Sequence, residues 1–156
     1  MASLLHLLIG TGKLMKPTDR MVIQHTCQEL VFQYAAFADR GDWQAVATLF
    51  TDDATFARPT APNDIIVGRA AILKAFKSRP PTITQHLVSN VIVNVENETH
   101  ASAQSILQLF IGKTNETDAL ASHAHPSPII GRFDDKFQLV EDQWLFLERR
   151  GTLTMK

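Results

Sequence analysis

His86 is the residue of this sequence that we expect to move a proton at neutral pH. An unperturbed imidazole titrates near pH 6.5, so neutral histidine accepts a proton without large tuning. His86 lies in a β-rich stretch where it alternates with Val88, Asn90, Ile92 and Asn94. Polar side chains interleaved with aliphatic ones suit a pocket wall, so His86, Val88 and Asn90 are predicted to line one. The alternative is a histidine that is only satisfied at the start of a strand.

Asp39 and Tyr34 lie on the helix expected before that strand. Asp39 falls near its C-terminal end, where the helix dipole disfavours a negative charge, so it does not serve helix stability. The alternative is a solvated turn residue. Tyr34 belongs to the apolar stripe, so its buried hydroxyl needs a partner, either in a pocket or on the backbone. Five residues separate the two side chains by about 140°, so they share a cavity only if the helix closes one side of it or its last turn is distorted.

Arg149 lies on the last expected strand beside a second arginine. Simple alternation places it on the face of Leu145 and Leu147, opposite Phe146. Both faces are half apolar, so the pattern alone does not choose between the two arginines. A buried arginine would hold a carboxylate or enolate through two hydrogen bonds. On the sheet surface, Arg149 would instead pair with an acid such as Asp135.

Other reactive residue types give weaker signals. His123-Ala124-His125 lies in a loop rich in alanine, serine and proline, without cysteine and with only Asp118 as a nearby acid, so no metal site is predicted. Cys27 lies on the apolar face of the first helix and is expected to be an inert core residue. The sequence contains no glycine-rich phosphate loop and no serine nucleophile elbow.

The elements that must position these residues change in period along the chain. Three helices are expected over 20–40, 43–50 and from 68 to the prolines at 80–81, with short strands at 54–57 and 65–67, turns at 51–53, and a loop at 59–63. Four long strands are expected over 82–95, 99–111, 129–140 and 144–154. Helices followed by a meander predict an α+β fold, with helices on one face of a curved antiparallel sheet whose concave face encloses a pocket.

Several runs, taken together and in order, resemble SnoaL-like domains of the nuclear transport factor 2-like superfamily. The runs are YAAFADRGDW at 34–43, LFTDDA at 49–54, GRAAI at 68–72, TQHLVSN at 84–90, GRFDD at 131–135 and WLFLERR at 144–150. The resemblance covers residue 20 to the C-terminus. It implies a cone-shaped half-barrel, with an antiparallel sheet that is mixed at its edge and about three N-terminal helices.

Within the superfamily the sequence is most similar to the scytalone dehydratase and bile acid dehydratase branch. Those enzymes use tyrosine, aspartate and histidine, and the bile acid enzymes add an arginine. The matching motif positions are Tyr34, Asp39, His86 and Arg149. Scytalone dehydratase has a second pocket tyrosine, whereas Tyr34 is the only tyrosine here, which argues against the same substrate. Trp43 and Phe133, which lie within or beside these runs, are predicted to contact the ligand.

These residues predict proton transfer next to a carbonyl group, by a cofactor-independent lyase or isomerase of dehydratase type. His86 would be the general base, Asp39 would orient it, Tyr34 would hydrogen-bond the enolate oxygen, and Arg149 would anchor an acidic group. The substrate would be hydrophobic and contain a ring, and neither a cofactor nor a metal is required. Two alternatives stay open: a small-molecule binding protein without an aligned His–Asp pair, and a structural subunit resembling a ring-hydroxylating dioxygenase β chain.

The composition limits the partners and the compartment. The 156 residues fit one domain over 20–156, preceded by an extension over 1–19, and 45% of them are hydrophobic. A net charge of −1 gives no footprint for nucleic acid or a membrane surface. The apolar run at 4–9 is too short to span a membrane and is expected to pack on this domain or a neighbouring subunit. The single cysteine excludes an internal disulfide and favours the cytoplasm.

The last strand also predicts self-association. Because both of its faces are apolar, and the helices cover only the concave face of the sheet, the convex face needs another cover. We therefore predict a homo-oligomer, a dimer rather than a trimer.

Overall fold

The computed structural model describes residues 15–113, 123, 124 and 128–156. The apolar stretch at 4–9 and the side chains of His123 and His125 lie outside this description, so what was expected of them stays a prediction. None of the helices in the described ranges is long and apolar enough to cross a membrane.

Three helices occupy the first half of the chain, as predicted. They are α1 (Pro17–Asp39), α2 (Trp43–Thr48) and α3 (Arg69–Lys77). Proline at the first turn suits the start of α1, because its missing N–H has no partner there in any helix. After α1 the chain turns at Gly41, whose φ of 66° is in the left-handed region that favours glycine. The side chain of Asp42 then caps α2 by accepting the N–H of Ala45 at 3.0 Å.

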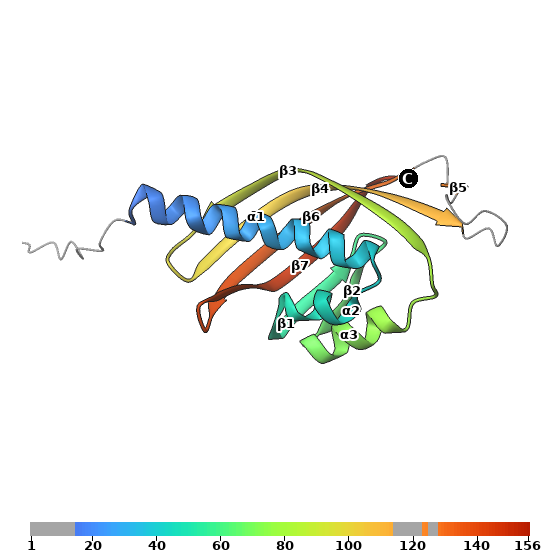
Figure 1. Cartoon of the computed structure of the whole chain (residues 1–156), viewed down its shortest axis with the longest axis horizontal. Helices are drawn as coiled ribbons and strands as arrows, with labels where there is room; N and C mark the ends of the chain where they lie inside the picture. Colours follow the sequence, from blue (N-terminus) through green and yellow to red (C-terminus); the bar gives the residue numbers. More distant parts are fainter. Residues whose placement is uncertain (1–14, 114–122, 125–127) are drawn as a thin grey trace, which may run out of the picture.

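A mixed, curved sheet forms the second layer and is not closed into a barrel (Figure 1). Its strands are β1 (Phe50–Arg58), β2 (Ala61–Val67), β3 (Ile83–Val95), β4 (His100–Lys113), β5 (His123–Ala124), β6 (Ile129–Val140) and β7 (Gln143–Met155). In the described part of the chain their order is β2-β1-β7-β6-β4-β3, with β5 pairing with β4. Neighbours are antiparallel except β1 and β7, which are parallel. The α+β fold with a mixed edge is therefore confirmed.

Two short segments differ from the sequence prediction. Residues 51–53, expected as a turn, belong to β1, whose register against β7 shifts between Phe50 and Thr55. Pro62 and Asn63, expected in a loop, belong to β2. A proline is tolerated there because β2 is an edge strand, where a missing N–H need not cost a ladder hydrogen bond.

Helix α1 crosses the sheet and is attached to the opposite edge strand, β3 (Figure 1). The side chains of Arg20, Gln24 and Gln28 donate to the carbonyls of Val95, Val93 and Val91 at 3.0, 3.2 and 3.2 Å. Side chains four apart on the helix thus meet carbonyls two apart on the strand. This polar ladder protects the β3 edge from pairing with another chain and fixes the register of α1 against the sheet.

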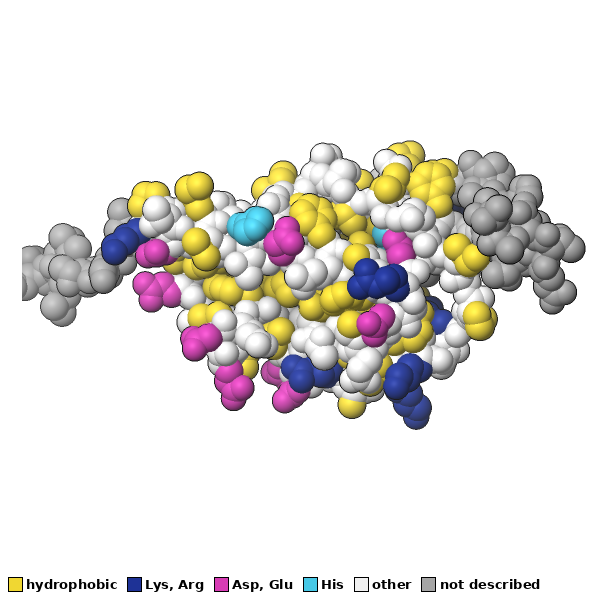
Figure 2. Space-filling model, viewed as in Figure 1, with side chains coloured by type: hydrophobic (Ala, Val, Ile, Leu, Met, Phe, Trp, Pro, Cys, Tyr) yellow, Lys and Arg dark blue, Asp and Glu magenta, His cyan; other side chains and the backbone are white. Residues whose placement is uncertain are grey.

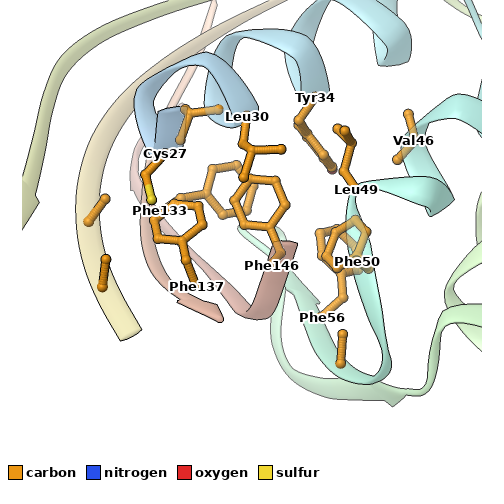
Figure 3. Packing of buried hydrophobic residues seen from close by; sticks show 14 of the residues in the cluster. Cys27, Leu30, Tyr34, Val46, Leu49, Phe50, Phe56, Phe133, Phe137 and Phe146 are labelled. Carbon is orange, nitrogen blue, oxygen red and sulfur yellow. The ribbon is translucent and has the colours of Figure 1, made fainter. Parts of the chain in front are cut away.

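An aromatic cluster fills the space between α1 and the sheet (Figure 3). Tyr34 points from α1 into this cluster, with its ring centre 6.2 to 6.3 Å from those of five phenylalanines. The five are Phe50, Phe56, Phe76, Phe133 and Phe146, from β1, α3, β6 and β7. Burying one such ring stabilises the fold by roughly 1.5–3 kcal/mol, so the cluster anchors α1 firmly over the concave face.

A bulge in β3 changes which residues share a face with His86. The pairing of β3 with β4 shifts between Ser89 and Ile92, and Asn90 has a φ of 51°. After this bulge Val93 turns inward, whereas Ile92 is 69% exposed. The expected alternation, which placed His86 and Ile92 on one face, is wrong beyond the bulge because one extra residue inverts the faces.

A second shift, in the pairing of β6 with β7, has the same effect on Arg149. The register changes between Lys136 and Phe137, so Leu147 is the extra residue of β7. Phe146 and Arg149 are both buried, at 0% and 1% exposure. The expectation that these two residues lie on opposite faces is therefore wrong, because the bulge brings both to the concave side.

Candidate active site

A cavity of about 710 Å³ opens at the end of the molecule where α1 terminates. Its walls come from the last turn of α1, the segment joining α3 to β3, the turn between β1 and β2, and the concave faces of β4 and β6. Its lining combines aromatic and aliphatic side chains with a few polar groups, which is the composition of small-molecule sites.

Asp39 and His86 meet on the wall of this cavity. One carboxylate oxygen of Asp39 contacts Nδ1 of His86, and the other accepts the backbone N–H of His86 at 2.8 Å. The hydroxyl of Thr84 donates to the first oxygen at 3.1 Å, and the amide of Gln85 donates to the second at 3.2 Å. The side chains of His86 and Asp39 are only 12% and 15% exposed. The pair is thus held in one arrangement by four contacts.

The contact with Asp39 sets the tautomer of His86. A carboxylate only accepts hydrogen bonds, so the proton of a neutral ring is assigned to Nδ1. Nε2 then carries the lone pair, and His86 lines the cavity. An imidazole oriented in this way can act as a general base, because the carboxylate behind it would stabilise the imidazolium.

Tyr34 and Asp39 line the same cavity although they point to different sides of α1. The helix is regular through Asp39, so the last turn is not distorted. Instead, the C-terminal end of α1 closes one side of the cavity. Tyr34 reaches in from the aromatic cluster, whereas Asp39 faces β3.

The hydroxyl of Tyr34 is kept neutral by its surroundings. Tyr34 is 5% exposed, and this burial raises its pKa. The positive charges of Arg149 and Arg79 work in the opposite direction without reversing the shift. A neutral phenol beside the cavity donates a hydrogen bond, which suits an oxygen that gains negative charge during a reaction.

The guanidinium of Arg149, on β7, stacks on the ring of Tyr34, and Arg149 does not belong to the cavity lining. Its guanidinium carbon lies 4.3 Å from the ring centre of Tyr34 and 3.9 Å from that of Phe133. Its Nη1 pairs with Asp135 at 2.7 Å, inside the core and not on the sheet surface. Burial raises the pKa of Asp135 to about 7, although Arg149 opposes the shift. The arginine is therefore engaged by an internal acid and by aromatic faces.

The other predicted ligand residues divide into two groups. Trp43 and Phe133 line the cavity. Val88 packs against the hydrophobic core and is outside the cavity lining, and Asn90 is exposed at the β3 bulge. The bulge explains the position of Asn90. The alternation that directs the side chain of His86 inward stops at the bulge, so Asn90 no longer shares that face.

Two further residues of the candidate site, Thr84 and Arg79, were missed by the sequence reasoning. Thr84 holds the Asp39 carboxylate, and its place two residues before His86 on the same strand face was a usable signal. Arg79 lines the cavity, but nothing in its sequence context distinguishes it from a solvated residue at a helix end. In the described ranges, no three histidine, cysteine or acidic side chains are grouped closely enough to hold a metal ion.

Comparison with known proteins places the fold in a family. The family model of the SnoaL-like domain matches residues 20–150. No curated protein gives a significant match.

Similar solved structures share the fold at low identity. A scytalone dehydratase-like protein from Novosphingobium aromaticivorans superposes with a TM-score of 0.75 at 22% identity, covering 90% of this chain and 89% of its own. The hexachlorocyclohexane dehydrochlorinase LinA, type 2, superposes with a TM-score of 0.73 at 14% identity, covering 90% of each chain. An NTF2-like protein with a cystatin-like fold from Novosphingobium aromaticivorans gives 0.66 at 20% identity and 92% of each.

Proposed function

The chain belongs to the SnoaL-like domain family, and from this premise we propose that it is a cofactor-independent lyase or isomerase that moves a proton next to a carbonyl group. The contact between Asp39 and Nδ1 of His86, on the wall of a cavity, carries this proposal. Two proteins of similar fold are named for eliminations, of water and of hydrogen chloride. The same reaction type suits the pair found here.

The proposed reaction begins with the loss of a proton from carbon. Nε2 of His86 takes the proton, the carbon–hydrogen electron pair moves toward the carbonyl, and Asp39 stabilises the imidazolium. The hydroxyl of Tyr34 donates a hydrogen bond to the enolate oxygen. In an elimination, the enolate then expels a hydroxyl group from the adjacent carbon, and this group leaves as water with the proton of His86. In an isomerisation, His86 returns the proton to another carbon.

In this proposal Arg149 is a positioning residue. Its guanidinium stacks on the ring of Tyr34, and its Nη1 is already paired with Asp135. The anchoring of an acidic substrate group, first expected of Arg149, therefore falls to another residue.

The lining favours a hydrophobic substrate that contains a ring. Trp43, Phe56, Leu107 and Ile111 contribute apolar surface around the polar pair. A binding protein without catalysis would have no need of a histidine base aligned with a carboxylate, as His86 is with Asp39. The alternative of a purely structural subunit would be favoured by a filled cavity, whereas this one has room for a ligand.

Carbon-bound hydrogen exchange tests the proposal without knowledge of the natural substrate. The protein is incubated with 2-tetralone in D₂O, and the loss of the α-proton signals is followed by NMR. We expect exchange faster than in buffer, and a loss of roughly 100-fold or more in His86→Asn. The matched control is His25→Asn, because His25 is an exposed histidine on α1 outside the cavity lining.

A panel of cyclic β-hydroxyketones, followed by the absorbance of the conjugated product, separates elimination from isomerisation. Binding of these compounds with no exchange above buffer would refute the enzymatic proposal and favour the binding protein.

A further inference from the structure

The cavity is lined by more positive than negative charge. Four basic residues, Arg40, Arg58, Lys77 and Arg79, contribute to its lining. The one acidic residue among the lining residues is Asp39, whose carboxylate is occupied by His86. Most of the lysine and arginine side chains visible in Figure 2 lie on the half of the molecule that holds α2 and α3. This end of the molecule therefore attracts an anion.

Arg79 is held in the cavity by aromatic rings. Its guanidinium carbon lies 4.0 Å from the ring centre of Phe76 and 5.9 Å from that of Trp43. The two rings are themselves stacked, with centres 5.4 Å apart and planes 14° from parallel. Stacking of this kind fixes the plane of a guanidinium and leaves the N–H groups at its edge free to donate.

No carboxylate pairs with Arg79 in the described part of the chain, and its side chain makes no hydrogen bond there. The contrast with Arg149 is direct, because Arg149 is paired with Asp135 at 2.7 Å. Arg79 is nonetheless only partly exposed. A half-buried guanidinium with five N–H donors, and no side-chain hydrogen bond to any described residue, is an arrangement that a bound anion would complete.

Arg58 adds a second positive charge near Arg79. Its own acid, Asp64, is distant, at 3.9 Å, and well exposed. Burial lowers the pKa of Arg79, and the charge of Arg58 lowers it further, whereas Tyr34 opposes the shift. The repulsion between two arginines that line one cavity is relieved when an anion binds to both.

We propose that the cavity binds a ring compound that carries a carboxylate, with the carboxylate on Arg79 and Arg58 and the ring between Trp43 and the aliphatic side chains of β4. The planar fork of a guanidinium matches the two oxygens of a carboxylate, which distinguishes this group from other anions. The binding site stands on its own. The further step, that this acid is the substrate presented to His86, rests on the proposed function.

Two probes of equal shape test the site. The dissociation constants of 2-naphthoate and of its neutral isostere 2-naphthamide are measured by calorimetry at low salt. We expect naphthoate to bind roughly tenfold tighter or more, because a charge-assisted pair replaces a neutral hydrogen bond. Added salt should weaken the binding of naphthoate and leave that of naphthamide unchanged.

Variants identify the residue responsible. Arg79→Gln should remove most of the preference for naphthoate while the affinity for naphthamide stays the same, and Arg79→Lys should retain a larger part of the preference. The control Arg132→Gln removes an arginine that pairs with Asp134 outside the cavity lining, and it should behave as wild type. Circular dichroism verifies the fold of each variant.

Any of three results would refute the proposed carboxylate site. The wild type could bind both probes with equal affinity, Arg79→Gln could leave the preference for naphthoate unchanged, or Arg79→Gln could weaken the binding of both probes equally. His86→Asn should keep the naphthoate preference, whereas it abolishes the exchange of 2-tetralone. A failure of the catalytic proposal is thus distinguished from a failure of the anion site, since the first is measured by exchange and the second by the ratio of two affinities.

Discussion

Asp39 holds His86 by two different groups of the same residue, the ring Nδ1 and the backbone N–H, across 47 positions of the sequence. The backbone bond ties the end of α1 to the edge strand β3, and the ring contact sets the direction of the imidazole. Because one carboxylate makes both contacts, the docking of the helix and the orientation of the base depend on each other. Thr84 and Gln85, the two residues before His86, complete the shell around that carboxylate.

Asp39→Asn should separate these two roles. An amide oxygen still accepts one hydrogen bond, so the fold should persist, but a neutral partner no longer stabilises the imidazolium. We expect the exchange rate of 2-tetralone to fall by roughly 10²-fold or more, with an unchanged far-ultraviolet circular dichroism spectrum. Glu29→Gln, at an exposed position of α1, is the control that removes an acid elsewhere on the helix. An exchange rate equal to wild type would refute the role of the carboxylate.

Asp135 should make stability depend on pH in a direction unusual for an aspartate. Its pKa is about 7 in the folded chain, against 3.8 for an unperturbed aspartate. Between these values the folded chain keeps a proton that the unfolded chain has lost. The stability contributed by this proton is fully present below pH 3.8 and is lost as the pH rises through 7.

The difference in unfolding free energy between wild type and Asp135→Asn isolates this group from the other acids. Urea titrations at several pH values from 4 to 8 should show the wild type losing stability relative to the variant as the pH rises. A difference that is constant, or that rises with pH, would contradict a raised pKa. Glu29→Gln, which removes an exposed acid on α1, is the control.

The sequence predicted the elements well and the face of each side chain less well, for an identifiable reason. Periodicity within an unbroken element is a local property, so α1 and the four long strands followed from it. The two bulges are not local in this sense. Asn90 tolerates a positive φ, which is a weak hint, but the register shift near Leu147 has no glycine or proline to announce it.

The site was predictable to the extent that it lies in the family motifs. Tyr34, Asp39 and His86 were named from the sequence, and all three line the cavity. The partner of Arg149, and the lack of a carboxylate beside Arg79 among the described residues, could not be decided in the same way, because both depend on which side chains arrive from other elements. Charge alone does not distinguish an arginine paired with an acid in the core from one that lines a cavity.

Self-association stays a prediction, and the structure suggests where to probe it. The middle of the outer sheet face carries ion pairs, such as Lys136 with Glu148 at 3.1 Å. Exposed apolar side chains also occur on the strands, among them Ile92, at 69%, Leu87, at 51%, and Met155, at 58%. We expect a dimer of twice the 17.4 kDa chain mass by sedimentation, weakened by Leu87→Asp. A wild-type mass of one chain at micromolar concentration would refute the prediction.

Gly151 should be required for the shape of the cavity, although it does not line it. A Cβ at this position would lie 2.4 Å from both Cδ and N of Pro59, so the backbone of the β1–β2 turn would have to move. Pro59 lines the cavity, as does Gly131, on which Pro59 also packs. We therefore expect Gly151→Ala to cost about 1–3 kcal/mol of unfolding free energy and to weaken the binding of both naphthyl probes together.

A double-mutant cycle distinguishes this clash from a general loss of stability. Pro59→Gly removes the ring and frees the turn, so Gly151→Ala should cost less in that background than in the wild type. A coupling of about 0.5 kcal/mol or more, measured by urea unfolding, is expected for two residues in direct contact. The same cycle applied to naphthamide binding tests the cavity itself, because the loss caused by Gly151→Ala should shrink once the turn can move. Strict additivity in both measurements would mean that the strand accommodates the methyl group without displacing Pro59, and the cavity wall would then be independent of Gly151.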